Sequence, residues 1–251
     1  MPRVLVTRAA SQAAVLAEQL KAAGVDVLHV PIVAFEKLPA VSELSRIGAS
    51  LLPGDAVAFT SANGVRFSQE GIRGSLPAGV IIAATGSRTA EACVRWLERE
   101  PECVPARFIA EEFAAELQRV VRAGGRVLLP RAERARDALP KALLAAGIGV
   151  DIVPVYRTLL AADAAVALER VLELDVLTFA SSLTVRLFDG LLEATGREEF
   201  RQTPTITIGP ITSNDARQLG YTVVAEAPEA TAESLARTVM TWWRRSHTPS
   251  K

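Results

Sequence analysis

Cysteine and histidine are scarce in this chain, and both shortages exclude classes of chemistry. There are only two of each among 251 residues. Cys93 and Cys103 form no C-x-x-C pair and have no histidine companions, which disfavours a disulfide framework and a zinc site and suits a reducing compartment. His29 falls in an expected strand and His247 in a polar tail. We therefore expect two structural thiols, no metal site and no histidine base.

Net charge and long apolar runs are missing as well. Lys plus Arg and Asp plus Glu both number 28, so no overall positive field would attract nucleic acid or an anionic membrane. No apolar run reaches the roughly 18 residues of a membrane span, and an expected strand begins too close to Met1 for a signal peptide. These absences predict a soluble, cytoplasmic protein. No amphipathic stripe is left over for a partner, so we expect a monomer.

The familiar catalytic and nucleotide-binding motifs are also absent. The sequence contains no G-x-S-x-G elbow, no P-loop lysine, no H-E-x-x-H and no G-x-G-x-x-G. The pair Gly124 and Gly125 precedes an expected strand instead of following one, which indicates a turn. Metal, nucleotide and covalent serine chemistry are disfavoured, and no cofactor is expected.

An internal repeat is present instead. Hydrophobic residues make up 49% of the chain and aromatic residues 5%, a balance typical of sheets covered by helices. The run from Val4 to Ala9 leads into an expected helix, a Gly and a strand closing at Pro31, and the run from Val127 to Ala132 does the same up to Pro154. Residues 55–61 likewise match 175–181, and the strand before Gly86 matches the strand before Gly209.

Short apolar strands that alternate with helices require parallel sheets with both faces covered. The sequence therefore predicts an α/β fold with two doubly wound parallel-sheet domains of flavodoxin or Rossmann type, joined by a two-stranded connector. Serial and nested domains both satisfy the repeat. The extended character of 35–39 and 156–161 favours nesting, with 1–34 and 162–251 as one domain, 40–155 as the inserted domain and those two segments as connector strands.

Ligands of open parallel sheets bind beyond the carboxyl ends of the strands, where loops lead into helix N-termini. Hydroxyls, glycine backbone and a few arginines occupy these places, and such a lining attracts carboxylates or phosphates through free amides and helix dipoles. The candidate binding residues are Arg8, Thr60, Ser61, Gly86, Thr89, Arg131, Ser181, Gly209 and Thr212. Two alternatives remain open. Ser61, Thr89, Ser181 and Thr212 could serve only as helix N-caps, and the two arginines could be solvated or ion-paired.

Tyr156 is one of two tyrosines in the chain and lies at the start of a connector strand. A phenol can donate a proton or hydrogen bond to a leaving hydroxyl but is a poor base at neutral pH. Tyr156 is therefore the candidate catalytic residue, with interfacial packing as the alternative.

Several motifs in this order and spacing resemble the uroporphyrinogen-III synthase family over nearly the whole chain. They are Val6-Thr7-Arg8, Phe59-Thr60-Ser61-Ala62-Asn63-Gly64-Val65, Thr85-Gly86-Ser87-Arg88-Thr89-Ala90, Pro130-Arg131-Ala132, Val153-Pro154-Val155-Tyr156-Arg157-Thr158, Phe179-Ala180-Ser181 and Ile208-Gly209-Pro210-Ile211-Thr212. The resemblance implies nested α/β domains with the active cleft between them. It also implies a cofactor-free lyase that cyclises hydroxymethylbilane, a linear tetrapyrrole octacarboxylate, to uroporphyrinogen III through a spiro intermediate, with loss of water.

The resemblance further implies roles for individual residues. Ser61, Thr89, Ser181 and Thr212 would bind carboxylates, Tyr156 would assist departure of the hydroxyl, and Arg8 and Arg131 would give weaker electrostatic help. Ile211 stands where many members carry a second small hydroxyl residue, which puts in doubt how many side-chain bonds hold the ligand there. Two other functions remain as alternatives: a non-catalytic sensor module of the same fold, and a two-domain glycosyltransferase.

Overall fold

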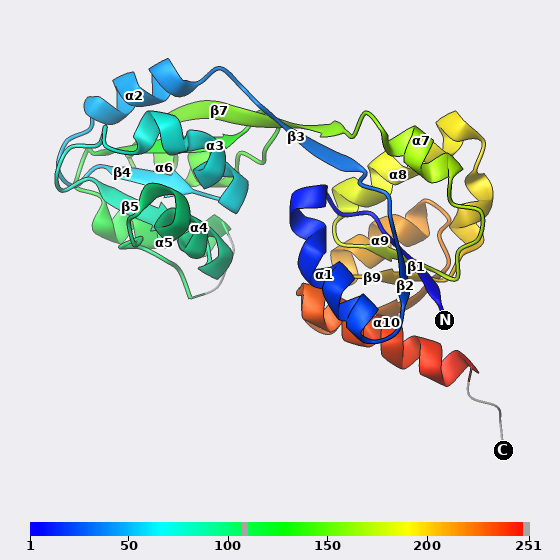
Figure 1. Cartoon of the computed structure of the whole chain (residues 1–251). Helices are drawn as coiled ribbons and strands as arrows, with labels where there is room; N and C mark the ends of the chain where they lie inside the picture. Colours follow the sequence, from blue (N-terminus) through cyan, green and yellow to red (C-terminus); the bar gives the residue numbers. More distant parts are fainter. Residues whose placement is uncertain (107–109, 248–251) are drawn as a thin grey trace. The chain divides into compact units, whose positions relative to one another are not determined.

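The computed structural model describes residues 1–106 and 110–247, and the chain divides into two compact units. Unit 1 comprises Met1–Ala34 and Leu159–Lys251, and unit 2 comprises Phe35–Thr158. Unit 2 is thus inserted into unit 1, and the chain passes between them within β3 (Val33–Lys37) and β7 (Gly149–Leu160) (Figure 1). Residues 35–39 and 156–158 of the expected connector belong to unit 2 by their contacts.

Unit 1 contains a five-stranded sheet in the order β10-β9-β8-β1-β2. Every neighbouring pair is parallel, which confirms the α/β class predicted from the repeat. Counted along the unit, this is the strand order of flavodoxin-like folds. The strands are β1 (Arg3–Val6), β2 (Asp26–His29), β8 (Val176–Phe179), β9 (Thr205–Thr207) and β10 (Val223–Glu226).

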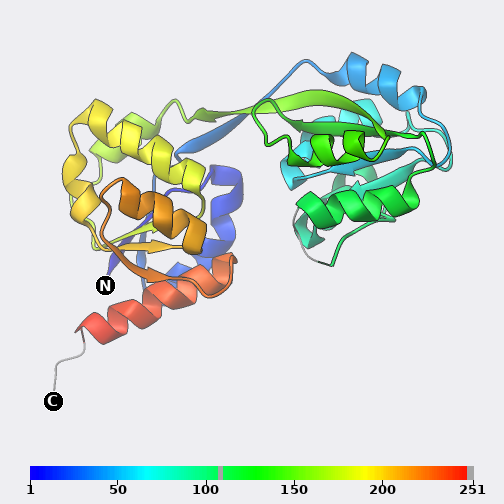
Figure 2. The ribbon, with the colours of Figure 1, turned by 180° about the vertical axis from the view of Figure 1, so that it is seen from behind.

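Helices cover both faces of this sheet, as the views from opposite sides show (Figures 1 and 2). Phe179 and Phe188 belong to the core on one face, and Val6 and Leu235 to the core on the other. Burial on both faces explains why the central strands β1 and β8 are largely apolar. The helices are α1 (Ala10–Ala22), α7 (Ala164–Glu169), α8 (Ser182–Thr195), the 3₁₀ turn η1 (Glu198–Gln202), α9 (Pro210–Gln218) and α10 (Ala232–His247).

Unit 2 contains a second five-stranded sheet, in the order β3-β7-β6-β4-β5. Its neighbouring strands are parallel, except β3 and β7. These two are antiparallel, because the N–H of Leu38 bonds to the carbonyl oxygen of Val155 and the N–H of Ala161 to that of Ile32. The core against one face contains Leu44, Val65 and Cys93, and the core against the other contains Phe113. The remaining elements are α2 (Val41–Ala49), β4 (Ala56–Phe59), α3 (Ala62–Ile72), β5 (Ile81–Ala84), α4 (Ser87–Leu97), α5 (Ala110–Val120), β6 (Arg126–Ala132) and α6 (Ala138–Ala145).

The two sheets repeat one another at the level of single residues. The strands β7-β6-β4-β5 correspond to β2-β1-β8-β9, in agreement with the sequence repeat. At the amino ends of these strands Asp55 accepts the backbone N–H of Arg126 at 3.0 Å, and its counterpart Asp175 accepts that of Arg3 at 2.7 Å. Each carboxylate satisfies an amide donor next to a central strand.

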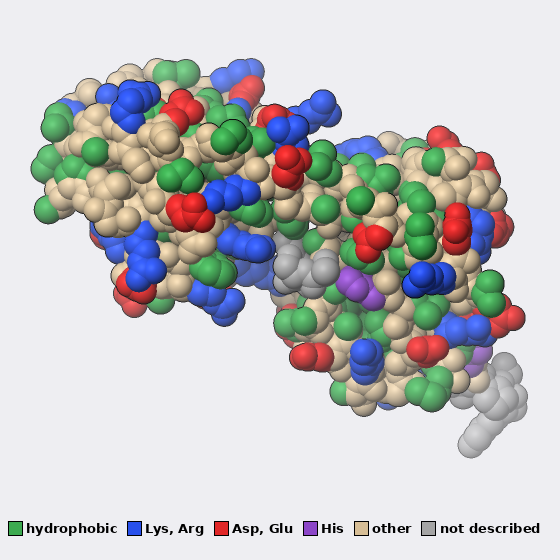
Figure 3. Space-filling view, turned by 45° about the horizontal axis from the view of Figure 1, so that its top comes forward, with side chains coloured by type: hydrophobic (Ala, Val, Ile, Leu, Met, Phe, Trp, Pro, Cys, Tyr) green, Lys and Arg blue, Asp and Glu red, His purple; other side chains and the backbone are tan. Residues whose placement is uncertain are grey.

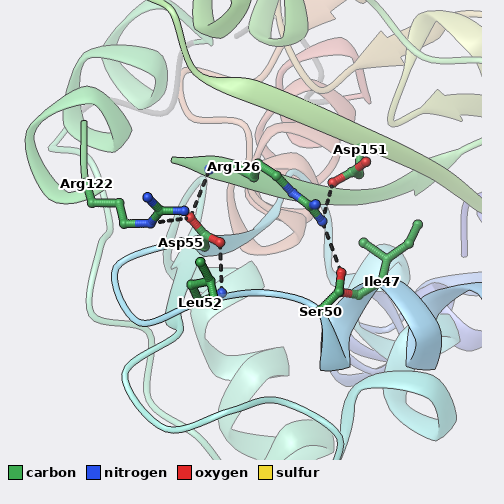
Figure 4. Close-up of polar contacts among 7 residues, drawn as sticks. All are labelled: Ile47, Ser50, Leu52, Asp55, Arg122, Arg126 and Asp151. Carbon is green, nitrogen blue, oxygen red and sulfur yellow. Dashed lines mark hydrogen bonds and ion pairs between the residues drawn. The ribbon is translucent and has the colours of Figure 1, made fainter. Parts of the chain in front are cut away.

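Asp55 collects further donors (Figure 4). Its carboxylate also accepts the backbone N–H of Leu52 at 2.8 Å and the Nε–H of Arg122 at 3.0 Å. Burial acts to raise the pKa of Asp55, but the two backbone donors and the Arg122 guanidinium outweigh it and hold the pKa below its usual value. Arg126 itself bonds outward to Asp151 and Ser50.

The helices that follow residues 55–61 and 175–181 begin at Ala62 and Ser182, because Ser61 and Ser181 cap them. One detail differs from the sequence predictions. His247 belongs to the last turn of α10 and not to a tail, and its ring stacks on Trp243 at 3.6 Å between centroids. His29 lies in β2, where its Nε2 is 2.9 Å from the carbonyl oxygen of Arg8.

Acidic and basic side chains are interspersed over both units on the face shown in Figure 3, in line with the zero formal net charge. Within residues 1–106 and 110–247, none of the helices is long and apolar enough to cross a membrane.

Candidate functional site

In each unit, two neighbouring parallel strands lead into helices whose N-termini lie at the carboxyl edge of the sheet. In unit 2, β4 and β5 pair and are followed by α3 and α4. In unit 1, β8 and β9 pair and are followed by α8 and α9. The first N–H groups of a helix have no intrahelical acceptor, and the dipole favours negative charge beside them. Each unit therefore presents two adjacent sites suited to an anion.

Ser61 and Ser181 are the N-caps of α3 and α8. The oxygen of Ser61 accepts the N–H of Gly64 at 3.0 Å, and that of Ser181 accepts the N–H of Thr184 at 3.2 Å. Both residues have extended backbone and are half-buried. The capping interpretation is thus confirmed for these two serines. Binding of a substrate carboxylate at the same place stays a prediction.

Thr89 and Thr212 are not N-caps, so that interpretation was wrong for both. The N-caps of α4 and α9 are Gly86 and Gly209, neither of which offers a side-chain cap, and each threonine is the third residue of its helix. Both threonines are 5% exposed. Each helix begins directly after the glycine turn, which carries the threonine into the packed first turn. The first N–H groups of both helices, which have no intrahelical acceptor, remain candidate donors here.

Tyr156 lies in β7 and is 7% exposed. Its ring stacks on Phe67 of α3 with 5.3 Å between centroids and meets Phe35 of β3 edge-on at 5.8 Å. Its hydroxyl is 3.3 Å from the Oγ of Ser61. The structure therefore places Tyr156 and Ser61 together at the N-terminus of α3. The same contacts satisfy the packing alternative, because the ring is held by two phenylalanines.

The remaining candidates differ in their surroundings. Thr60 is exposed directly after β4, next to Ser61. Arg8 follows β1, and its carbonyl oxygen contacts His29. The guanidinium of Arg131 bonds to Asp137 at 2.8 Å and to the carbonyl oxygen of Arg136 at 3.1 Å. Arg131 is thus ion-paired, the second alternative of the sequence analysis, and its side chain is only 12% exposed.

Neither thiol is suited to act as a nucleophile. Burial, with a smaller effect of Glu102, raises the pKa of Cys93 to about 12. Burial, with a smaller effect of Glu116, raises the pKa of Cys103 to about 11. Both are free cysteines, as expected. In the part of the chain that the structure describes, no cluster of three or more His, Cys, Asp or Glu could hold a metal ion.

Sequence reasoning missed a polar chain in unit 1. Ser213 of α9 lies 2.5 Å from the Oγ1 of Thr207 and donates to the carboxylate of Glu226 at 2.6 Å. Thr207 and Ser213 are fully buried. The spacing of the three residues gives no sequence motif. Their buried hydroxyls beside a strand end are the signal that could have pointed to them.

A comparison with protein families matches residues 14–237 to the family described as uroporphyrinogen-III synthase HemD. The chain belongs to the uroporphyrinogen-III synthase family. Uroporphyrinogen-III synthase of Synechococcus elongatus is 30% identical over 256 residues, covering 97% of this chain and 96% of that protein. The resemblance drawn from the sequence motifs is thereby confirmed.

Solved structures of the family have the same fold. A mutant uroporphyrinogen III synthase from the extremely thermophilic bacterium Thermus thermophilus matches with a TM-score of 0.62 at 21% identity, covering 98% of both chains. Uroporphyrinogen-III synthetase from Helicobacter pylori matches with a TM-score of 0.62 at 19% identity, covering 96% of this chain and 100% of that one. At these identities the likeness establishes the fold of two α/β units.

Proposed function

We propose that this chain catalyses the reaction of its family, the cyclisation of hydroxymethylbilane to uroporphyrinogen III with inversion of the terminal pyrrole ring and loss of water. The family match extends over residues 14–237, and the Synechococcus relative over 97% of the chain. The enzyme is then a lyase of porphyrin biosynthesis. Membership of the family disfavours the glycosyltransferase alternative.

The helix N-termini of α3, α4, α8 and α9 are the proposed binding sites for substrate carboxylates. The substrate is a flexible polyanion, and it cyclises unaided to the wrong isomer, so the enzyme must chiefly hold it in one folded geometry. Oriented amides with fixed dipoles provide such binding without a net positive protein. The proposed ligands are Ser61, Thr89, Ser181 and Thr212 with the adjacent Thr60, Gly86 and Gly209. Both threonines are 5% exposed, and the N–H of Thr89 bonds to the carbonyl oxygen of Gly86, so the first N–H groups of α4 and α9 are the proposed donors at these two helices.

Tyr156 is the proposed catalytic residue, and the observation that carries this role is its 3.3 Å contact with Ser61 at the N-terminus of α3. A carboxylate bound there would lie beside the phenol. Tyr156 donates its proton as the carbon–oxygen bond of the terminal hydroxymethyl group breaks, and the oxygen leaves as water. The resulting azafulvenium carbon is attacked by the substituted α-carbon of the last pyrrole, giving the spiro intermediate. The bond from that α-carbon to its original methylene bridge then breaks, and the bridge carbon bonds to the other α-carbon of the same ring, which is thereby inverted. That second α-carbon loses its proton, which balances the one donated by Tyr156.

Arg8 and Arg131 have weaker proposed roles. The pairing of Arg131 with Asp137 offsets part of its charge, which supports an electrostatic influence and not a direct grip on the substrate. We also propose that the enzyme acts without a cofactor, as a monomer in the cytoplasm, and does not bind nucleic acid. The equal numbers of acidic and basic residues support the last point.

The test is an isomer assay. Hydroxymethylbilane made freshly by its synthase is supplied to the protein, the products are oxidised, and isomers I and III are separated. Isomer III in excess over the protein-free reaction supports the proposal. Isomer I alone, with tetrapyrrole bound, would indicate the sensor alternative.

A further inference from the structure

A chain of two hydroxyls and a carboxylate spans the turn from β9 into α9. Thr207 is the last residue of β9, Ser213 the fourth residue of α9 and Glu226 the last residue of β10. An ionised carboxylate only accepts hydrogen bonds, so Ser213 donates to Glu226. The Oγ1 of Thr207 lies 2.5 Å from the Oγ of Ser213 and 3.5 Å from the carbonyl oxygen of Gly209, to which it can donate.

These hydrogen-bonded side chains lie on either side of the turn at Ile208 and Gly209, which leads into α9. The N–H of Ser213 also bonds to the carbonyl oxygen of Gly209 at 3.0 Å, and the N–H of Ile208 to that of Phe179 at 2.9 Å. Glu226 thus reaches the first turn of α9 through Ser213. The turn is held on one side by β8 and on the other by β10.

Unit 2 provides an internal comparison, because apolar residues occupy the three corresponding positions at its turn from β5 into α4. The alignment of Gly86 with Gly209 places Ala84 opposite Thr207 and Ala90 opposite Ser213. In unit 2, Ala83 forms a parallel bridge with Cys103, and in unit 1 the corresponding residue Ile206 pairs with Ala225. One residue further along, Val104 therefore corresponds to Glu226. The corresponding turn of unit 2 therefore forms with Ala, Ala and Val, without a polar chain of this kind.

The first turns of α4 and α9 differ in their own hydrogen bonds. In α4, the N–H groups of Thr89 and Ala90 both bond to the carbonyl oxygen of Gly86, at 3.0 and 2.9 Å. In α9 the N–H of Ser213 makes the corresponding bond to Gly209 at 3.0 Å, and the first helical residue, Pro210, has no N–H. The proposed carboxylate donors of α9 are thus the N–H groups of Ile211 and Thr212, in a turn that is tied to β10 through Ser213 and Glu226.

We propose that Glu226 is a positioning residue for substrate binding, which acts through Ser213 and Thr207 to hold the first turn of α9 in the orientation that binds a substrate carboxylate. This inference rests on the proposed function. Glu226 does not touch the substrate in this scheme. It keeps a pair of main-chain donors aligned, and alignment of donors is what gives a polyanion its single folded geometry.

The central experiment converts the turn of unit 1 to that of unit 2 by the triple substitution Thr207→Ala, Ser213→Ala and Glu226→Val. Because unit 2 folds with these residues, we expect the thermal midpoint to change by only a few degrees. KM for freshly made hydroxymethylbilane is expected to rise about tenfold while kcat stays within about twofold, since the loss is one of binding. Unchanged KM would overturn the proposal.

Two single variants separate hydrogen bonding from charge and from general surface effects. Glu226→Gln keeps an acceptor for Ser213 and is expected to keep KM within about twofold of the wild type. A loss as large as that of the triple variant would contradict positioning by hydrogen bonds. Asp215→Asn is the matched control, because it removes the surface ion pair of α9 with Arg186 and leaves the turn intact. It should behave like the wild type.

Amide hydrogen exchange gives a readout that does not depend on turnover. In the ligand-free triple variant, the peptide containing residues 208–213 is expected to exchange about tenfold faster than in the wild type, because a restraint on the turn is lost. Equal exchange would overturn the proposal even if KM rose. Should the wild type form no isomer III, the proposed function fails, while the exchange comparison still decides whether Glu226 positions α9.

Discussion

The hydroxyl of Tyr156 lies 3.3 Å from the Oγ of Ser61, although 95 residues separate them in the chain. Ser61 is also the acceptor for the N–H of Gly64, so its hydroxyl proton is free to point toward a ligand or toward the phenol. This contact couples the cap of α3 to the proposed proton donor.

Replacement of Tyr156 by Phe should lower kcat by about one to two orders of magnitude, because a proton donor is lost while the ring packing on Phe67 and Phe35 stays. The thermal midpoint should change little. Steady-state kinetics and thermal unfolding check both statements. Tyr221→Phe is the matched control, since Tyr221 is buried against Phe179 in unit 1, and it should retain full turnover. Unchanged turnover in Tyr156→Phe would reduce that residue to a packing role.

The two capping serines should each make a small contribution. Ser61→Ala and Ser181→Ala are expected to lower the free energy of unfolding by about 1 kcal/mol, as for other lost N-caps, and kcat/KM by no more than about tenfold, since neighbouring amides remain. Chemical denaturation and the isomer assay measure the two effects. Ser42→Ala, at an exposed position in α2, serves as the control. A thousandfold loss from Ser61→Ala would contradict binding that is distributed over many donors.

The sequence predicted those features that local chemistry or repetition determines. The two α/β sheets followed from strand and helix lengths and from the repeat of 55–61 in 175–181. The caps at Ser61 and Ser181 followed from residue type. At Thr89 and Thr212 the same rule failed, because a glycine three residues earlier begins each helix and residue type alone does not decide between two possible starts.

Contacts through space could not be predicted in the same way. The stacking of Phe67 on Tyr156 depends on how α3 lies against β7, and nothing in the spacing of the two residues encodes it. The bond from Ser213 to Glu226 depends likewise on the register of β9 and β10, which includes an irregularity between Val223 and Ala225. Only the folded chain brings such pairs together.

The two thiols should be unreactive in the native protein. Their raised pKa values, about 12 for Cys93 and about 11 for Cys103, leave almost no thiolate at pH 8, and both side chains are buried. An aromatic disulfide reagent should therefore label neither thiol within minutes at pH 8, and both after addition of denaturant. Rapid native labelling of either residue would show that its part of unit 2 opens locally.

Two helix glycines should respond in opposite directions to alanine. A Cβ at Gly71 of α3 would lie 2.7 Å from the Cβ of Leu44 and 2.9 Å from the carbonyl oxygen of Val41, whereas a Cβ at Gly190 of α8 meets nothing within 4 Å. Gly71→Ala should therefore cost about 1–3 kcal/mol by overpacking, and Gly190→Ala should add about 0.5–1 kcal/mol through helix propensity. Chemical denaturation measures both. Stabilisation by Gly71→Ala would contradict the close approach of α2 and α3.

The buried carboxylate of Asp55 should give unit 2 a stability that depends on pH. Because its folded pKa lies below its unfolded value, the ionised form stabilises the fold fully above about pH 3.9, and this contribution is lost as pH falls through the folded pKa. Asp55→Asn should lower the free energy of unfolding by about 2–4 kcal/mol at neutral pH. The asparagine side chain keeps one acceptor oxygen, but its NH2 group would point at N–H groups that donate to the carboxylate in the wild type.

The difference in unfolding free energy between the wild type and Asp55→Asn should narrow as pH falls below about 3.9, because only the wild type loses the carboxylate contribution there. Denaturation curves collected across this range measure it, and effects of other acidic groups cancel between the two proteins. Asp151→Asn is the control. The Asp151 side chain is 35% exposed and forms an ion pair with Arg126, and a partly exposed ion pair contributes little to the free energy of unfolding. A gap for Asp55→Asn that stays constant with pH would show that shape and not charge makes this carboxylate necessary.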